Sequence, residues 1–178
     1  DGSDEDGVVD TGADLVVGQT NASATVNVQN APGGAKLDAW MDFNQDGDWS
    51  DAGEQIVTNS AMVNGDNVLT FDVPATASAG TTYARLRLST VGGLGVTGSA
   101  ADGEVEDHQI EIAPQADFGD APSPYPVTRS ENGAEHVPTG PTLGPTRDKE
   151  VDGAHSAAAD GDGSDEDGVV DTGADLVV

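Results

Sequence analysis

Oxygen-bearing side chains recur at alternate positions in one short stretch of this 178-residue sequence, between residues 42 and 54. The alternate residues are Asp42, Asn44, Asp46 and Asp48, and two more acids follow at Asp51 and Glu54. Alternate carboxylate and amide oxygens around a glycine turn let a short loop supply the roughly six to eight oxygen ligands that Ca²⁺ prefers. The stretch therefore predicts a calcium site, with a solvated polar hairpin loop as the alternative.

The pattern differs from the helix-flanked calcium loop in two respects. That motif has its bidentate acid at the position occupied here by Gly53, one residue before Glu54. Residues 36–41 alternate with a period of two, which predicts a strand before the loop. We therefore expect a calcium loop between strands. Glu104 and Glu106 are further candidate ligands if their strand runs beside the loop, and otherwise form a solvated strand face.

Two more acidic groups lie towards the C-terminal end of the sequence. The first is Asp148, Glu150 and Asp152, again alternate acids followed by a glycine, and the second is Asp160, Asp162, Asp165 and Asp167. These patterns are less regular than the first. They predict at least one further calcium, with a simple acidic linker as the alternative.

The charge of the chain limits its partners. Acidic residues number 33 against six basic ones, which gives a formal net charge of −27. Such a field repels a phosphate backbone, and the scattered bases form no basic patch, so nucleic acid is excluded as an expected partner. Two carboxylates about 4 Å apart repel by roughly 4 kcal/mol at an effective dielectric of 20, so we expect the metal-free chain to be loosely held.

The sequence gives little support for other classes of function. There is no cysteine, which fits a bacterial surface protein stabilised by calcium instead of disulfides. No apolar run reaches the ~20 residues of a membrane helix, so we expect no membrane insertion. His108, His136 and His155 lack a metal-binding spacing, and no serine stands in a nucleophile elbow. We expect a protein that is not an enzyme.

An exact repeat organises the chain. Residues 1–17 recur unchanged as residues 162–178, which predicts one unit of a tandem array, with neighbouring repeats as its partners. We expect four segments: 1–12 and 162–178 as starts of successive repeats, 13–113 as a sandwich, and 114–161 as a calcium-binding linker module. Seven of the nine prolines lie in the last of these, between Pro114 and Pro145, so it should be rich in loops.

Residues 13–112 alternate short apolar-patterned runs with turn residues, which predicts an all-β, Ig-like antiparallel sandwich. The expected strands are 13–17, 24–29, 36–42, 55–59, 68–73, 82–89 and 104–112. In the last of these strands, Val105 stands at an odd-numbered position, whereas Ile110 and Ile112 stand at even-numbered ones. In a regular strand Val105 would therefore face the opposite side of the sheet from the two isoleucines. This mismatch predicts a bulge or a change of face near Asp107 and His108.

Three blocks of sequence carry a resemblance to a known family. They are residues 39–49 (AWMDFNQDGDW), residues 83–87 (YARLR) and residues 103–107 (GEVED). With these blocks the chain resembles the GEVED domain, a β-sandwich module of large bacterial secreted and surface proteins. The resemblance implies an extracellular, non-catalytic, calcium-dependent module of an adhesin-like or structural repeat protein.

Three functions remain open at this stage. The first is a structural repeat unit of an extracellular filament or adhesin stalk on a bacterial cell surface, made rigid by calcium. The second is a carbohydrate or surface-ligand module that binds a glycan through Trp40, Trp49 and Tyr125. The third is a self-assembling fibre subunit, in which residues 169–178 complete the sheet of a neighbouring copy by strand addition.

Overall fold

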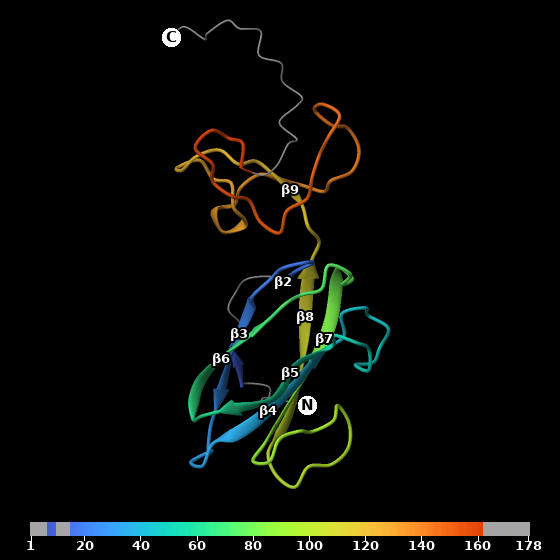
Figure 1. Ribbon diagram of the computed structural model, residues 1–178, viewed down its shortest axis with the longest axis vertical. Helices are drawn as coiled ribbons and strands as arrows, with labels where there is room; N and C mark the ends of the chain where they lie inside the picture. The colour runs from blue at the N-terminus through green and yellow to red at the C-terminus, as the bar shows by residue number, and fades with distance from the viewer. Residues whose placement is uncertain (1–6, 10–14, 162–178) are drawn as a thin grey trace, which may run out of the picture. The chain divides into compact units, whose positions relative to one another are not determined.

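The computed structural model describes residues 7–9 and 15–161, which divide into two compact units between Pro114 and Gln115. The first unit is a two-sheet β-sandwich, and the second consists mostly of loops (Figure 1). The predicted all-β sandwich with an appended loop-rich module is therefore confirmed. Among the described residues, no helix has the length and apolar character needed to cross a membrane.

The sandwich pairs a three-stranded sheet with a five-stranded one (Figure 1). The smaller sheet has the order β1 (Val8–Val9), β3 (Ala22–Val28), β6 (Gly65–Phe71). The larger has the order β2 (Leu15–Val16), β8 (Glu104–Ala113), β7 (Gly80–Ser89), β4 (Ala35–Met41), β5 (Gln55–Met62). The described strand pairs run antiparallel, apart from β2 and β8, which are parallel.

Apolar side chains at alternate strand positions fill the space between the sheets, as the period-two pattern predicts. One cluster joins Val26 and Val28 of β3 to Leu37 and Ala39 of β4. A second lies towards the end of the sandwich where β4 finishes, and contains Ala22, Met41, Phe43, Val73, Ala84 and Ile112. The core therefore depends on residues from both sheets.

The prediction of a bulge in β8 is wrong. β8 pairs with β7 in one unbroken antiparallel register, from Gly80 opposite Ile112 to Leu88 opposite Glu104. The inward face of β8 continues through His108 to Glu106, which is only 8% exposed, while Val105 is outward and 55% exposed. The prediction from alternating apolar residues failed because the carboxylate of Glu106 occupies an inward position.

Strand β1 was not predicted, because Val8 and Val9 follow a run of acids in residues 1–12, which we expected to be the start of a repeat that precedes the sandwich. The structure pairs them with Val26 and Thr25 of β3. The irregularity expected in β8 occurs instead between β4 and β5, where the register shifts on either side of Ala39.

Asp38 lies beside this irregularity and is completely buried. Its Oδ1 accepts a hydrogen bond from the backbone N–H of Asn59 at 2.7 Å, and its Oδ2 accepts one from Leu94 N–H at 2.9 Å. One carboxylate thereby attaches both β5 and the long loop 90–103 to the sheet.

The second unit contains little regular structure. β9 (Asp117–Phe118) pairs with β10 (Glu135–His136), and Ala116 forms a β-bridge with Glu150. A single 3₁₀ turn, η1 (Arg129–Glu131), begins at Thr128, whose side chain and that of Glu131 form a capping box. Ala116, Phe118 and Val127 are buried and form the small apolar centre of the unit.

We expect Asp38→Ala to lower the free energy of unfolding of the sandwich by about 2–4 kcal/mol, because two buried N–H groups lose a charged acceptor. Chemical denaturation at a fixed calcium concentration measures the change. Asp66→Ala is the matched control, since Asp66 is exposed and hydrogen-bonds only an exposed Asn27 amide among the contacts described; it should cost less than about 0.5 kcal/mol. Equal losses in the two variants would contradict this account.

Candidate metal sites

The loop of residues 42–54 leaves the end of β4 and returns to the start of β5. Its alternate oxygens accept hydrogen bonds from backbone N–H groups ahead of them. The bonds are Asp42 from Gln45 (2.6 Å), Asn44 from Asp46 (2.9 Å), Asp46 from Asp48 (3.2 Å) and Asp48 from Ser50 (2.7 Å). These Asx-type turns coil the loop tightly, which brings its acids together.

Three carboxylates of the loop converge. One oxygen each from Asp46, Asp48 and Asp51 lies within 4.8 Å of the other two, and all three residues are exposed. The Asn44 amide donates to Asp51 at 2.6 Å and to Asp46 at 3.3 Å. Like charges at this separation repel, so the grouping favours a cation.

Glu54 is the last residue of the loop, and its side chain is buried, at only 2% exposed. Its Oε2 accepts a hydrogen bond from Asp51 N–H at 3.1 Å, whereas its Oε1 is buried without a hydrogen-bond partner. Burial raises the pKa of the Glu54 carboxyl, and the negative charges of Asp42 and Asp51 raise it further. A buried carboxylate oxygen with no donor is costly unless a proton or a cation satisfies it.

Glu104 and Glu106 do not join this loop. Met41, the last residue of β4, is opposite Ala84, which is opposite His108. Glu104 is four residues beyond His108 along β8, about 13 Å away at the rise of an extended strand. Glu106 instead accepts a hydrogen bond from Gly7 N–H at 3.1 Å and contacts His108 Nε2 at 2.9 Å.

The second unit brings together a different set of acids from the one predicted. Carboxylate oxygens of Asp117, Asp148 and Glu150 lie within 4.8 Å of one another, and Asp148 Oδ1 is buried without a hydrogen-bond partner. The pairing of Ala116 with Glu150 places Asp117 beside the other two. From the sequence Asp117 could equally cap a turn or bind a metal. Spacing did not group it with Asp148, because a long loop separates the two residues.

The remaining predicted ligands lie elsewhere. Asp152 Oδ1 accepts a hydrogen bond from Arg129 N–H at 2.7 Å and so fixes the start of η1. Asp160 Oδ1 accepts one from the Ser156 hydroxyl at 2.8 Å. Asp162, Asp165 and Asp167 are outside the described residues.

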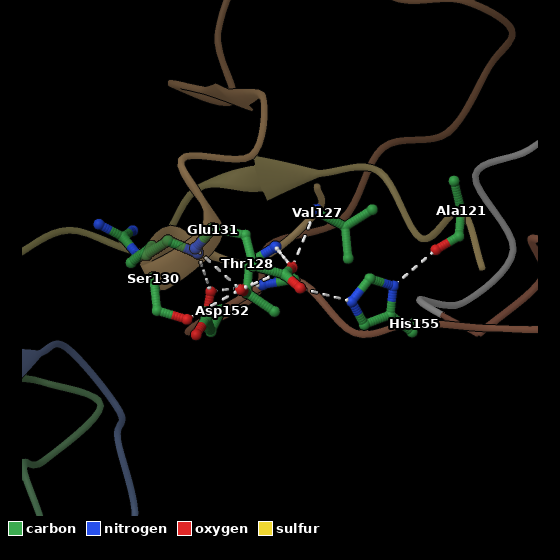
Figure 2. Close-up of polar contacts among 9 residues, drawn as sticks. Ala121, Val127, Thr128, Ser130, Glu131, Asp152 and His155 are labelled. Atoms are coloured by element: carbon green, nitrogen blue, oxygen red, sulfur yellow. Dashed lines mark hydrogen bonds and ion pairs between the residues drawn. The ribbon is translucent and has the colours of Figure 1, made fainter. Parts of the chain in front are cut away.

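A polar network that the sequence did not reveal centres on His155 (Figure 2). Its Nδ1 lies 2.9 Å from the carbonyl oxygen of Ala121 and its Nε2 lies 3.0 Å from Glu131 Oε1. Both neighbours are acceptors, so the imidazolium, which has two donors, satisfies both contacts. The Ala121 carbonyl and then Glu131 raise the pKa of His155, while His155 and Thr128 lower the pKa of Glu131 from 4.5 to about 2.

The tryptophan rings are largely engaged within the sandwich. Trp40 is 5% exposed. Trp49 donates from Nε1 to the carbonyl oxygen of Tyr83 at 3.0 Å, and the Arg85 guanidinium lies 4.5 Å from its ring centroid. Tyr125, in contrast, is 63% exposed. A sugar site on these three rings stays a prediction, and the burial of Trp40 does not favour its part in it.

A chain of contacts links the loop to β7 and β8. Arg85 of β7, stacked on Trp49, donates to both carboxylate oxygens of Asp107 of β8, at 2.7 and 2.6 Å. Before β8, Gly103 has a φ of 95°, and a Cβ there would lie 1.9 Å from the Leu88 carbonyl oxygen. Only glycine fits at that position.

These features define an all-β sandwich domain in which an acidic loop between strands is anchored to the central strands by an arginine. The family model of the GEVED domain matches residues 36–111. The chain thus contains a GEVED domain, and the resemblance seen in its sequence is confirmed. Comparisons with curated proteins and with solved structures gave no match.

We expect His155 to titrate above its ordinary pKa of 6.5 and Glu131 to titrate near 2, measured by NMR. Because folding raises the pKa of His155, its stabilising contribution is complete below about pH 6.5 and is lost as the pH rises through the folded value. Because folding lowers the pKa of Glu131, its contribution is present above about pH 4.5 and is lost as the pH falls towards 2.

Glu131→Gln should lower the pKa of His155, whereas His136→Gln should leave it unchanged. An unaltered His155 titration in Glu131→Gln would show that the pair does not form.

Proposed function

We propose that this chain is a structural repeat unit of an extracellular bacterial surface protein, and that bound Ca²⁺ stiffens it. The observation that carries the proposal is Glu54, a buried carboxylate with one oxygen lacking any hydrogen-bond donor, beside three convergent carboxylates. A solvated hairpin loop has no reason to bury such a group.

Calcium suits the donor set of this loop. Carboxylate and amide oxygens are its preferred ligands, and it accepts irregular coordination. Asp46, Asp48, Asp51 and Glu54 would hold the ion. Asn44, whose amide nitrogen donates to Asp46 and Asp51, would add its oxygen only after the amide group turns over. Each carboxylate that already accepts an N–H keeps further lone pairs for a metal. Binding would relieve the repulsion among the acids and hold the two ends of the loop together.

A second calcium is proposed in the loop-rich unit, at Asp117, Asp148 and Glu150. These residues come from β9 and from the segment bridged to Ala116. An ion shared among them would fasten two distant parts of a unit that has little apolar core. Stiffening this unit as well as the sandwich suits a stalk, because both would otherwise yield under load.

The structural role also has support outside the metal sites. The identical segments 1–17 and 162–178 indicate an array of repeats. Resemblance to GEVED proteins favours a bacterial cell-surface setting. Neighbouring repeats are the proposed partners.

Calcium should raise the melting temperature of the chain, and a chelator should reverse the rise. A site held at about a hundred times its dissociation constant adds roughly 2.7 kcal/mol. Glu54→Gln should abolish the part of this response that belongs to the sandwich. Without calcium the same variant should be as stable as the parent or more so, since it removes a buried charge.

Isothermal titration calorimetry and calorimetric melting measure both effects, with Asp66→Asn as a control that changes the same charge on an exposed strand position. Melting that ignores calcium in the parent chain, or an equal calcium response in Glu54→Gln, would overturn the proposal for this loop.

Asp148→Asn provides a separate test of the second site. We expect one calcium fewer per chain by calorimetric titration, with the Glu54-dependent site unaffected, because the two sites lie in different units. Small-angle scattering should show that the parent becomes more extended or less variable in length with calcium and that Asp148→Asn responds less. Unchanged stoichiometry in Asp148→Asn would remove the second site and leave the first standing.

A further inference from the structure

The N-terminal segment of the chain pairs with both sheets of the sandwich. Its binding place, which we call the seat, is the edge of β3 at Thr25 and Val26 together with the edge of β8 at Ile112 and Ala113. At β1, Gly7 donates from its N–H to Glu106 Oε1 at 3.1 Å and accepts at its carbonyl from Asn27 N–H at 2.7 Å. Val8 lies opposite Val26 and packs against the core cluster of β3, β4 and β5. β1 thus adds an edge strand to the smaller sheet.

The same segment also completes the larger sheet. Leu15 and Val16 of β2 lie opposite Ile112 and Ala113 of β8 in parallel register, and Val17 N–H donates to the Ala113 carbonyl oxygen at 3.0 Å. Val16 is 3% exposed, and Leu15 packs against the second core cluster. One short stretch of chain therefore closes both sheets of the sandwich.

The seat is selective for the sequence that fills it. A Cβ at Gly7 would lie 2.8 Å from Glu106 Oε1, so this position requires glycine unless Glu106 moves. The apolar side chains that follow must fall at the spacing of Val8 and Leu15 to reach their two clusters. Within the 178 residues, a second segment meets these demands in full, because residues 162–178 repeat residues 1–17 without a change.

We propose that the seat of one chain also accepts residues 168–177 of a second copy, with Val169 in the place of Val8 and Leu176 in the place of Leu15. This occupant is chosen because its sequence is identical to that of the resident segment, so it offers the same side chains and backbone groups for insertion. Two segments compete for the seat, the chain's own N-terminal segment and residues 168–177 of a second chain. Which one is bound depends on the effective concentration of the first compared with the concentration of the second chain. Successive exchanges join chains head to tail.

This inference does not depend on calcium, so its test is run at one calcium concentration. The double substitution Val8→Asp with Leu15→Asp damages the resident segment and leaves the donor intact. The matched control is Val169→Asp with Leu176→Asp in the C-terminal segment of the same chain. These substitutions change the composition and charge of the chain equally. The variant with all four substitutions shows how stable the sandwich is with no intact segment.

Analytical ultracentrifugation over a range of protein concentrations measures assembly, and calorimetry measures melting. We expect the Val8/Leu15 variant to assemble at an at least about tenfold lower concentration than the parent, because its tethered competitor is lost. In the assembled state its melting temperature should return towards that of the parent and exceed that of the fourfold variant. The Val169/Leu176 variant should melt like the parent and stay monomeric.

Three results would overturn the proposal. The first is a Val8/Leu15 variant that stays monomeric and melts with the fourfold variant, which would mean that the second segment does not enter the seat. The second is a monomeric Val8/Leu15 variant as stable as the parent, which would mean that the segment enters the seat of its own chain. The third is assembly of the Val169/Leu176 variant, which would place the contact elsewhere.

Discussion

The shortage of positive charge is the constraint on which the rest of this structure depends. Six basic residues cannot pair with 33 acids, so most carboxylates need another source of positive potential. In the described part of the chain, backbone N–H groups repeatedly provide this positive potential by donating hydrogen bonds to carboxylates. Asp38 uses two of them to hold a strand and a loop, and Asp42 to Asp48 use a succession of them to coil the candidate calcium loop. At Glu54 no N–H group reaches the second carboxylate oxygen, which is buried without a hydrogen-bond partner.

The few arginines are placed where they reach several groups at once. Arg85 joins Trp49 of the loop to Asp107 of β8. Arg87 is buried and donates to three carbonyl oxygens of the loop after β7, those of Gly95, Thr97 and Gly98. The three sequence blocks by which the GEVED domain was recognised are therefore one connected structure.

Sequence reasoning recovered those features that depend on local pattern. Period-two apolar residues located the strands of both sheets apart from β1, and alternate apolar side chains of β3 and β4 pack in the core. It failed where a polar group took an inward place, as Glu106 does, because burial of a paired carboxylate leaves no apolar signal. It failed again at Asp117, whose nearness to Asp148 follows from a long-range bridge. Loop spacing did indicate that Asp46, Asp48 and Asp51 lie close together, since Asx turns act within a few residues.

The parallel pairing of β2 with β8 has a mechanical consequence. β2 belongs to the segment by which the chain enters the sandwich, and β8 is the strand by which it leaves for the second unit. Tension on the chain pulls two parallel neighbours in opposite directions along their length. Force then acts on their hydrogen bonds in shear, so that the bonds must break together and cannot open one after another as in a hairpin peeled from its end. A short pair of strands placed in this way resists stretching better than its length suggests.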